Sequence, residues 1–409
     1  MESSPTNNNT VTIAVTGCVH GCIQKMYNDI QSYSKLHNKH IDLVLCTGDF
    51  ECMISKNDLN YLSCPPKYKH MGDFYKYYEG YLPTPYTTIF IGGNHEASNI
   101  LNDHFYGGYI CDKIYYLGRS GVVKYKGVRI AGVSGIFNVY DYKKGYYERN
   151  LLEKGNMKSV FHVREFDIVK LAHLTGSVDV MVSHDWPSGV VDVRDVDKVS
   201  GYNCDLKNEL IHNELGSYGN EYLLKHIKPK RWICGHMHYY YTNKVNGVDV
   251  CCLDKCLHKR KYFEVIDVDV TTVNNDVSGD SGIYVDGEWI AINKALNKVF
   301  PNEKAIYDYT NYFPNKEMYI NTTNKVNSIN SYLKVNDTYR DVNYDEFINE
   351  LNGIKKEVQD VKVEMNVDQY TTMIEIFGIV DKHYCSYNKC SNESVTHKYN
   401  NKEEIQIDI

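Results

Sequence analysis

The chain has 409 residues, of which 43% are hydrophobic, and a formal net charge of −7. This length can bury one large core and still carry an appended segment, so one or two domains are expected. The negative charge excludes a strong overall attraction to nucleic acid, although local basic and aromatic surface could still bind it. No window approaches 18 continuous apolar residues, and residues 1–10 lead into no apolar signal segment, so we expect a soluble protein that is not secreted.

Thirteen cysteines are scattered between Cys18 and Cys390. Their number is odd, and they lack the regular spacing of a disulfide framework. We therefore expect a reducing compartment, the cytosol or the nucleus.

Apolar runs typical of strands alternate with helical patterns up to about residue 270. In chain order, strands are predicted over 12–18, 41–50, 87–96 and 113–118, a hairpin over 121–136, and further strands over 178–186, 231–238, 248–255 and 262–270. Helices are predicted over 23–36, 162–174 and 220–227. Strands broken by helices predict an α/β core, and the strand-rich second half indicates one sheet packed on another. We expect one main domain over 11–270.

Beyond residue 270 the composition becomes rich in Asn and Asp. The stretches 271–282 and 321–331 are predicted to be loops or flexible links. Residues 344–365 have helical periodicity. We therefore predict that 271–409 forms a smaller helical and loop appendage with a disordered end at about 390–409.

Five short motifs follow predicted strands, where open α/β sheets place their sites. They are GCVHG (17–21), GDF (48–50), GGNHE (92–96), SHDW (183–186) and GHMH (235–238). Each motif alone has an ordinary structural explanation, since a single His after a strand is more often a hydrogen-bonded structural residue than a ligand. Together they supply metal-competent side chains: Cys18, His20, Asp49, Asn94, His184, His236 and His238. The combination predicts a metal centre.

The order of these motifs resembles the calcineurin-like metallophosphoesterase superfamily, which has D-x-H, then G-D, G-N-H-E/D, a single His and G-H-x-H. The resemblance implies two packed β-sheets flanked by helices, with two metals bridged by the Asp of the second motif. Cys18 replaces the first Asp, which narrows the resemblance to the lariat RNA debranching enzymes. Further similar stretches are PPKYKHMGDFYKYYEG (65–80), YDYKKGYYE (140–148), FHVRE (161–165) and LDKCL (253–257). The resemblance covers about 11–260.

The resemblance implies hydrolysis of the 2′,5′-phosphodiester at the branch of an excised intron lariat. One metal would be held by Cys18, His20, Asp49 and His238, and the other by Asp49, Asn94, His184 and His236. His95 matches the catalytic His of the superfamily and would give a proton to the leaving 2′-oxygen. Because a soft thiol at Cys18 disfavours Mg²⁺ and Ca²⁺, we expect one or two ions of Fe²⁺, Zn²⁺ or Mn²⁺.

Residues 138–165 occupy the place of the family's lariat-recognition loop. The substrate-binding residues expected here and in the basic and aromatic stretches are Lys67, Tyr68, Tyr78, His162 and Arg164. Any one of these basic patches could instead be solvated loop charge. Glu165 stands where many members have Asn, which leaves its contact with RNA open.

Glu96 and Asp185 neighbour predicted ligands. They are either partners that orient imidazoles or ordinary turn carboxylates, and the sequence leaves both interpretations open.

Two other functions remain open. The first is a general metallophosphoesterase that acts on nucleotides or phosphoproteins, against which the recognition-loop motifs argue. The second is a metal-free protein-binding scaffold of the same fold, which would have lost ligands or His95, whereas all are present. We expect branched RNA as the partner, no membrane, no obligate protein partner, and a location in the nucleus or also in the cytoplasm.

Overall fold

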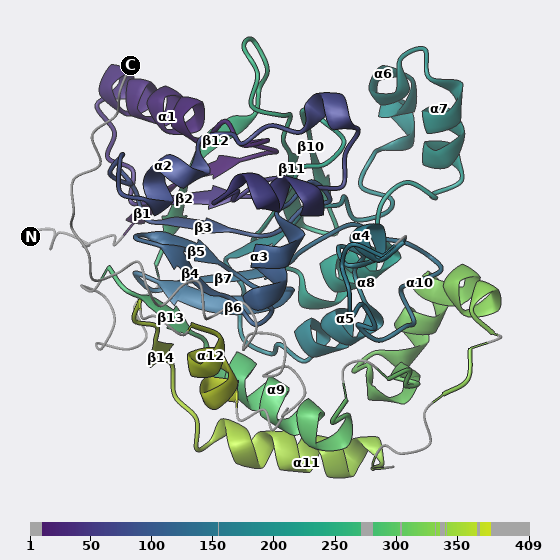
Figure 1. Cartoon of the computed structure of the whole chain (residues 1–409). Coiled ribbons are helices and arrows are strands. Elements are labelled where there is room, and N and C mark those ends of the chain that lie inside the picture. The colour runs from purple at the N-terminus through teal and green to yellow at the C-terminus, as the bar shows by residue number, and fades with distance from the viewer. Residues whose placement is uncertain are drawn as a thin grey trace, which may run out of the picture.

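Two β-sheets pack against each other in the computed structural model, and helices cover their outer faces (Figure 1). The structure describes residues 10–153, 155–270, 281–302, 305–331, 333–335, 340, 342–365 and 369–377. One sheet has six strands in the order β12-β1-β2-β3-β5-β4, and the other has eight in the order β10-β11-β9-β8-β7-β6-β13-β14. The predicted α/β fold of two packed sheets is therefore confirmed.

Parallel strands form the middle of both sheets. The first sheet contains β1 (Thr10–Thr16), β2 (Leu43–Cys46), β3 (Thr88–Phe90), β4 (Gly108–Cys111), β5 (Ile114–Tyr116) and β12 (Phe263–Asp269). The second contains β6 (Ser120–Tyr125), β7 (Val128–Val133), β8 (Val180–Ser183), β9 (Arg231–Cys234), β10 (Tyr241–Val245), β11 (Val248–Cys252), β13 (Ile283–Val285) and β14 (Val361–Lys362). The loops after parallel strands leave each sheet at one edge, which is where the five motifs lie.

Successive side chains of the central strands point alternately into two cores, one on each face of the first sheet. In β1, Ile13 and Val15 belong to the core between the sheets, whereas Ala14 belongs to the core beneath the outer helices. In β2, Leu45 faces the inner core and Val44 the outer one. Side chains of a strand alternate between two apolar faces, so these strands are almost continuously apolar.

Helices on the outer faces show the matching apolar spacing. Helix α1 (Ile23–His37) buries Ile23, Met26, Tyr27 and Ile30 against the first sheet, a spacing of three to four residues that puts them on one face. Helices α2 (Phe74–Tyr78) and α3 (Ser98–Asp103) lie on the same side (Figure 1). On the second sheet, α5 (Glu165–Ala172) contacts β6 and β7, and α8 (Tyr218–Ile227) and α9 (Gly287–Val299) pack on α5.

The remaining helices lie in connections and in the C-terminal part. They are α4 (Asn156–Ser159), α6 (Val196–Ser200), α7 (Cys204–Ile211), α10 (Lys316–Ile329), α11 (Tyr344–Lys355) and α12 (Gln369–Phe377). Short 3₁₀ helices are η1 (Lys56–Tyr61), η2 (Pro66–Tyr68), η3 (Val193–Asp195) and η4 (Thr310–Tyr312). Among the described residues, no helix combines the length and apolar character needed to cross a membrane.

The strands and helices predicted between residues 11 and 270 are present, and the structure adds β4 and β10. One prediction for the tail was wrong, because most of 321–331, expected to be a loop, lies in helix α10. Tyr319, Thr323 and Val326 are its buried residues, spaced four and three apart, so this helix has an apolar stripe although its other positions are rich in Asn and Thr. The helical spacing of these buried residues therefore outweighs the high Asn content, which was the reason for predicting a loop.

The helix predicted over 344–365 is shorter than expected. Helix α11 ends at Lys355, and β14 follows at Val361–Lys362 and pairs with β13, which in turn pairs with β6. The C-terminal part therefore extends the second sheet. Residues 271–280 and the predicted disordered end at 390–409 lie outside the described residues, and the boundary at 270 stays a prediction.

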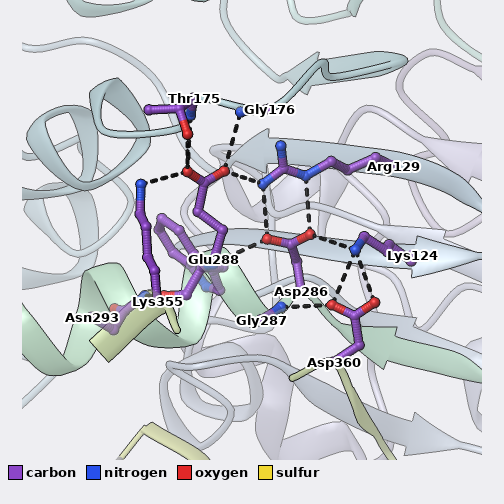
Figure 2. A network of polar contacts seen from close by, with 11 residues as sticks. Lys124, Arg129, Thr175, Gly176, Asp286, Gly287, Glu288, Asn293, Lys355 and Asp360 are labelled. Atoms are coloured by element: carbon purple, nitrogen blue, oxygen red, sulfur yellow. Dashed lines mark hydrogen bonds and ion pairs between the residues drawn. The ribbon is translucent and has the colours of Figure 1, made fainter. Parts of the chain in front are cut away.

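A network of ion pairs built around the buried Arg129 and Asp286 joins this C-terminal part to the second sheet (Figure 2). It consists of Lys124, Arg129, Asp286, Glu288, Lys355 and Asp360, and we call it the α9 ion-pair network. Arg129 donates to Asp286 from Nε at 3.0 Å and from Nη2 at 2.8 Å. The Nζ of Lys355 lies 2.6 Å from Glu288 Oε1, and Lys124 Nζ lies 2.8 Å from Asp360 Oδ2. Asp286 also caps the N-terminus of α9.

Candidate metal centre

The five motifs lie at the carboxyl ends of β1, β2, β3, β8 and β9, three strands of one sheet and two of the other. The loop after β1 carries Cys18 and His20, and the loop after β2 carries Asp49. Asn94, His184, His236 and His238 come from the loops after β3, β8 and β9. The packing of the two sheets thus brings together side chains that lie up to 220 positions apart in the sequence, from Cys18 to His238.

The backbone of these loops is held in an unusual conformation. His20, Asp49, Glu51, His236 and His238 all have positive φ angles, between 48° and 66°. For residues other than glycine this left-handed conformation costs about 1–2 kcal/mol each, and it persists where surrounding structure enforces it, as it often does at functional sites. The cluster of such residues in one place therefore indicates a site.

Cys18, His20, Asp49 and His238 form the first group of ligand atoms. One atom from each lies within 4.8 Å of all the others. The Nε2 atoms of His20 and His238 are 3.0 Å apart, and His20 Nε2 is 3.6 Å from Asp49 Oδ2. Asp49 Oδ2 is buried and has no hydrogen-bond partner. One sulfur, two imidazole nitrogens and one carboxylate oxygen converge here, which is a donor set suited to a divalent transition metal.

His184 and Asn94 lie on the other side of Asp49. His184 Nε2 is 3.4 Å from Asp49 Oδ1 and 3.1 Å from Asn94 Oδ1. The His184 ring contacts the His236 ring, with 5.0 Å between their centroids. The two carboxylate oxygens of Asp49 therefore face different ligand groups, as a bridging position requires.

The surroundings of the centre favour the ligand forms of Asp49, His184 and His238, whereas at His20 burial is outweighed by Glu51 and Asp49, which raise its pKa. Burial alone would raise the pKa of Asp49, but His184, His20 and His95 lower it to about 2, so the carboxylate is ionised at neutral pH. Burial is the main cause that lowers the pKa of His184 to about 4 and that of His238 to about 3. Neutral imidazole is the form that ligates metals.

The thiol of Cys18 is different. Burial, followed by the neighbouring Asp49 carboxylate, raises its pKa well above the usual range. A bound cation would therefore be needed to convert it to the thiolate that ligates. The backbone N–H of His236 donates to Cys18 Sγ at 3.1 Å, which holds the sulfur in the centre.

Glu51 is a functional residue that the sequence analysis missed. Its Oε1 lies 3.2 Å from Nδ1 of His20, so the other ring nitrogen of His20 is turned toward the ligand group. The Thr47 carbonyl does the same for His184, at 2.8 Å from Nδ1. In the sequence, the only signal for Glu51 was its position two residues after Asp49, and many loop carboxylates lie that close to a candidate ligand.

The structure decides between the two interpretations of Glu96 and Asp185. Glu96 accepts hydrogen bonds from the backbone N–H groups of Phe50, Glu51 and Gly93. Asp185 accepts from those of Phe137 and Trp186. Both are turn carboxylates that hold the ligand loops by accepting from backbone N–H groups, not by orienting an imidazole of the centre. They fix the loops on which the ligands stand.

His95 lies beside the centre. Its backbone N–H donates to Asp49 Oδ1 at 2.8 Å, and its ring lies 5.7 Å from the His20 ring. Its Nδ1 is 3.1 Å from the carbonyl oxygen of Ser63, so the Nε2 atom is the one left for another partner. The partly exposed side chain is therefore available to a substrate rather than enclosed in the core.

The expected substrate-binding residues occupy three environments. Lys67 and Tyr68 are exposed on η2, close in sequence to Ser63, with Lys67 Nζ 4.8 Å from the centroid of the Tyr68 ring. Tyr78 is half-buried and packs on Phe74. The loop before η2 is thus bonded to His95 through Ser63, and Tyr78 packs within α2.

His162 and Arg164 are engaged within the protein. His162 Nδ1 lies 2.6 Å from Asp141 Oδ2. Arg164 is fully buried and donates from Nη2 to Glu148 at 2.6 Å. These two contacts tie parts of segment 138–165 to each other, so the structure gives both residues a role inside that segment, and their contact with phosphate stays a prediction.

Lys255, in LDKCL, is a second residue that the analysis of the motifs missed. The next residue, Cys256, donates its N–H to the Cys18 carbonyl at 2.8 Å, so this loop is tied directly to the first ligand loop. After burial and His20, the charge of Lys255 is the next cause that lowers the pKa of His238. Lys255 thus adds positive charge to the surroundings of the centre.

Comparisons with known proteins agree with this site. Residues 11–240 match the family described as calcineurin-like phosphoesterase, and residues 249–382 match the C-terminal domain of lariat debranching enzyme. The chain is 39% identical to the lariat debranching enzyme of Arabidopsis thaliana over 73% of this chain and 71% of that protein. It is 40% identical to lariat debranching enzyme A of Xenopus laevis and 36% identical to the human lariat debranching enzyme.

The chain covers 54% of the length of the Xenopus relative and 54% of the human one, so it spans about half of these proteins. The matches include the loops that carry the predicted ligands and extend into the C-terminal part. They confirm the family that the five motifs and Cys18 predicted. The chain belongs to the lariat debranching enzyme family of the calcineurin-like phosphoesterases.

Proposed function

We propose that this chain hydrolyses the 2′,5′-phosphodiester bond at the branch point of lariat RNA. The observation that carries the proposal is the position of Cys18 in one ligand group with His20, Asp49 and His238, within 4.8 Å, in a chain of the debranching family. Branched RNA is then the partner, and excised introns are the source. A nuclear location follows as part of the same proposal, because introns are released there.

The residues present fit a divalent metal. Asp49 Oδ2 is a buried carboxylate oxygen without a partner, and the donor set combines a soft sulfur with imidazole nitrogens. We assign Cys18, His20, Asp49 and His238 to one position, and Asp49, Asn94, His184 and His236 to a second. A cation held there would polarise the phosphate and lower the pKa of a water toward about 7. The sulfur favours Zn²⁺ or Fe²⁺, with Mn²⁺ as the third candidate.

His95 is the proposed proton donor. The hydrogen bond from its N–H to Asp49 and the contact of Nδ1 with Ser63 hold its ring beside the centre, with Nε2 free to give a proton to the leaving 2′-oxygen. General acid catalysis is typically worth about 10²- to 10⁴-fold in rate. His95→Ala should lose activity by that factor while it keeps its metal content and its affinity for branched RNA. Loss of metal in proportion to activity would instead make His95 a ligand.

The experiment that tests the function compares two linkages. Purified protein, loaded with metal under reducing conditions, is given a branched oligonucleotide with one 2′,5′ linkage and a linear 3′,5′ oligonucleotide of matched sequence. The branch should be cut and the linear RNA left intact, and Asp49→Asn should cut neither. Equal rates on both substrates would favour the general metallophosphoesterase. Activity that persists in Asp49→Asn would point to a contaminating nuclease.

A further inference from the structure

Segment 138–165, which we call the recognition segment, is braced from within by ion pairs. They join Asp141 to Lys144 and His162, Glu148 to Arg164, and Lys143 to Glu165. Their N–O distances lie between 2.6 and 2.9 Å. Glu165, Glu148 and Arg164 are nearly or fully buried. These pairs give the segment a defined internal shape, and the Lys143–Glu165 pair joins it to the first residue of α5.

The outer side of the recognition segment presents aromatic rings. Tyr140 is 59% exposed and Tyr147 is 39% exposed. Exposed aromatic rings can stack on unpaired bases, as single-stranded RNA requires. Whether these rings reach a branch nucleotide depends on the position of the segment relative to the metal centre.

One end of this region is fixed to the metal centre itself. The N–H of Phe137, just before the segment, donates to Asp185 Oδ2 at 2.9 Å, and Asp185 follows the ligand His184. The N–H of Gly135 donates to the carbonyl of Gly92 at 2.8 Å. The start of the segment is therefore set by the ligand loops, and the buried rings of Tyr142 and Tyr146 join its middle to the core, so a contact from the C-terminal part would add a third support.

That support comes from helix α10, more than 150 residues later in the chain. The hydroxyl of Tyr319 donates to Oε1 of Glu165, at the end of the segment. The Nδ2 of Asn330, just after α10, donates to the carbonyl of Val139 at 2.6 Å, near its start. Figure 1 shows α10 beside α8 and on the same side of the molecule as α4 and α5. Both ends of the recognition segment are thus bonded to one C-terminal helix.

Tyr319 is itself rigidly held. It is fully buried, its ring stacks on that of Phe313 with 3.5 Å between centroids, and it meets the Tyr222 ring at 5.4 Å. Glu165, which also accepts from Lys143 Nζ at 2.7 Å, is therefore bonded by a fixed donor from the helix and by a cation from the segment. A rigid donor limits the movement of the group that it binds.

We propose that helix α10 holds the recognition segment in the position in which it binds branched RNA, with Tyr319 and Asn330 as positioning residues. This inference rests on the proposed function. It gives the C-terminal part a role in substrate binding, and it explains the acidic residue at 165 by a partner inside the protein instead of a contact with RNA.

The test separates substrate binding from chemistry. Tyr319→Phe and Asn330→Ala are assayed for KM and kcat on the branched oligonucleotide and for turnover of bis(p-nitrophenyl) phosphate, a diester too small to need the recognition segment. We expect KM for branched RNA to rise about tenfold in Tyr319→Phe, the factor that corresponds to one lost hydrogen bond to a charged group, and less in Asn330→Ala, whose bond is to a neutral carbonyl. The kcat and the turnover of the small diester should change less than about twofold, since the metal centre is intact.

Tyr312→Phe is the matched control. Tyr312 is buried in the same part of the chain, and its hydroxyl donates to the Val342 carbonyl at 2.5 Å, away from the recognition segment. Its substitution should lower the Tm about as much as Tyr319→Phe does and leave KM unchanged. The inference is overturned if Tyr319→Phe raises KM no more than Tyr312→Phe, or if it reduces turnover of both substrates equally.

A second measurement does not depend on the substrate. Hydrogen exchange of the backbone amides in 138–165 should be faster in Tyr319→Phe than in the wild type, and unchanged in Tyr312→Phe. Unchanged exchange in Tyr319→Phe would overturn the inference even if the chain debranches RNA. Faster exchange together with equal cleavage of both linkages by the wild type would support the brace and refute the proposed function.

Discussion

The metal centre and the α9 ion-pair network are both clusters of buried and partly buried polar side chains, but they differ in how their polar atoms are satisfied. In the metal centre, Asp49 Oδ2 and Glu51 Oε2 are buried without a hydrogen-bond partner. In the network, Asp286 and Glu288 each accept from Arg129 and from at least one further donor (Figure 2). Within the described part of the chain, no side chain of the network has a buried polar atom without a partner.

This difference distinguishes a metal-binding site from an ion-pair network with a purely structural role. Buried polar groups are nearly always paired, so an unpaired carboxylate oxygen among imidazoles indicates a partner that the protein alone does not supply. The left-handed backbone at the metal ligands points the same way, because strain persists where function requires it. The network has neither feature, and its charges compensate one another.

The largest effect is expected from Asp49→Asn, which removes charge from the metal centre and keeps the shape of the side chain. Activity should fall by more than about 100-fold, the upper range seen for residues that only support a ligand. The free energy of unfolding without metal should change little, because the lost attraction of the neighbouring imidazoles is offset by relief of the buried carboxylate oxygen that has no partner. Steady-state rates and urea unfolding in a chelator would check both. A large loss of metal-free stability would contradict the account.

Asp286→Asn should produce the opposite pattern. Asp286 is 2% exposed and is the bidentate partner of Arg129, so its neutralisation leaves a buried guanidinium with less compensation. We expect a loss of about 3 kcal/mol in the free energy of unfolding. The kcat of the folded protein should not change. A reduced kcat at a temperature where the variant is folded would show that the two regions are coupled.

Glu51→Ala tests whether a residue behind the ligands contributes to metal binding. Glu51 contacts the Nδ1 of His20, the ring nitrogen that is turned away from the other ligands, so the affinity for metal should fall by about 10- to 100-fold. The measurement is metal binding by competition with a coloured chelator. Unchanged affinity would make Glu51 an ordinary loop residue.

Lowering the pH should weaken the α9 ion-pair network, with a smaller effect on the free energy of unfolding than Asp286→Asn has. Burial alone would raise the pKa of Glu288 above 4.5, but Lys355, Thr175 and Arg129 lower it to about 2. Between about pH 4.5 and pH 2 the unfolded state binds more protons, so the stability that Glu288 contributes is present above this range and is lost as the pH falls through it. Urea unfolding at pH 5 and pH 3 should show a loss roughly 1–2 kcal/mol larger in the wild type than in Glu288→Gln. The same pH dependence in both proteins would remove Glu288 from the network.

The ligands and the fold could be predicted because each motif carries its own local signal. An apolar strand followed by Gly and then by Asp, Asn or His is visible within a few residues, as in GDF at 48–50. GDF, GGNHE and GHMH have this form, and together with GCVHG and SHDW they predict one site, since parallel strands bring their carboxyl ends together. The family resemblance added the roles of His95 and Cys18.

Other features depend on distant partners and could not be predicted. Nothing near Arg129 shows that it pairs with Asp286, which lies 157 positions away. Helix α10 was hidden because only three buried positions, Tyr319, Thr323 and Val326, define its face among Asn and Thr residues that are weak helix formers. Glu51 and His20 both have positive φ angles, which cannot be predicted from the sequence for residues other than glycine, and so their contact could not be predicted either.

The most direct test of the account is the stabilisation that added metal gives to three proteins. Thermal unfolding of the wild type, Asp49→Asn and Asp286→Asn is measured with a chelator and with Zn²⁺ or Mn²⁺ at about 100 times its Kd for the wild type, where a single native site adds about 2.7 kcal/mol. The wild type and Asp286→Asn should show the same upward shift of Tm, although Asp286→Asn starts from a lower value. Asp49→Asn should start close to the wild-type value and show no shift. A full shift in Asp49→Asn, or none in Asp286→Asn, would contradict the assignment of the two regions.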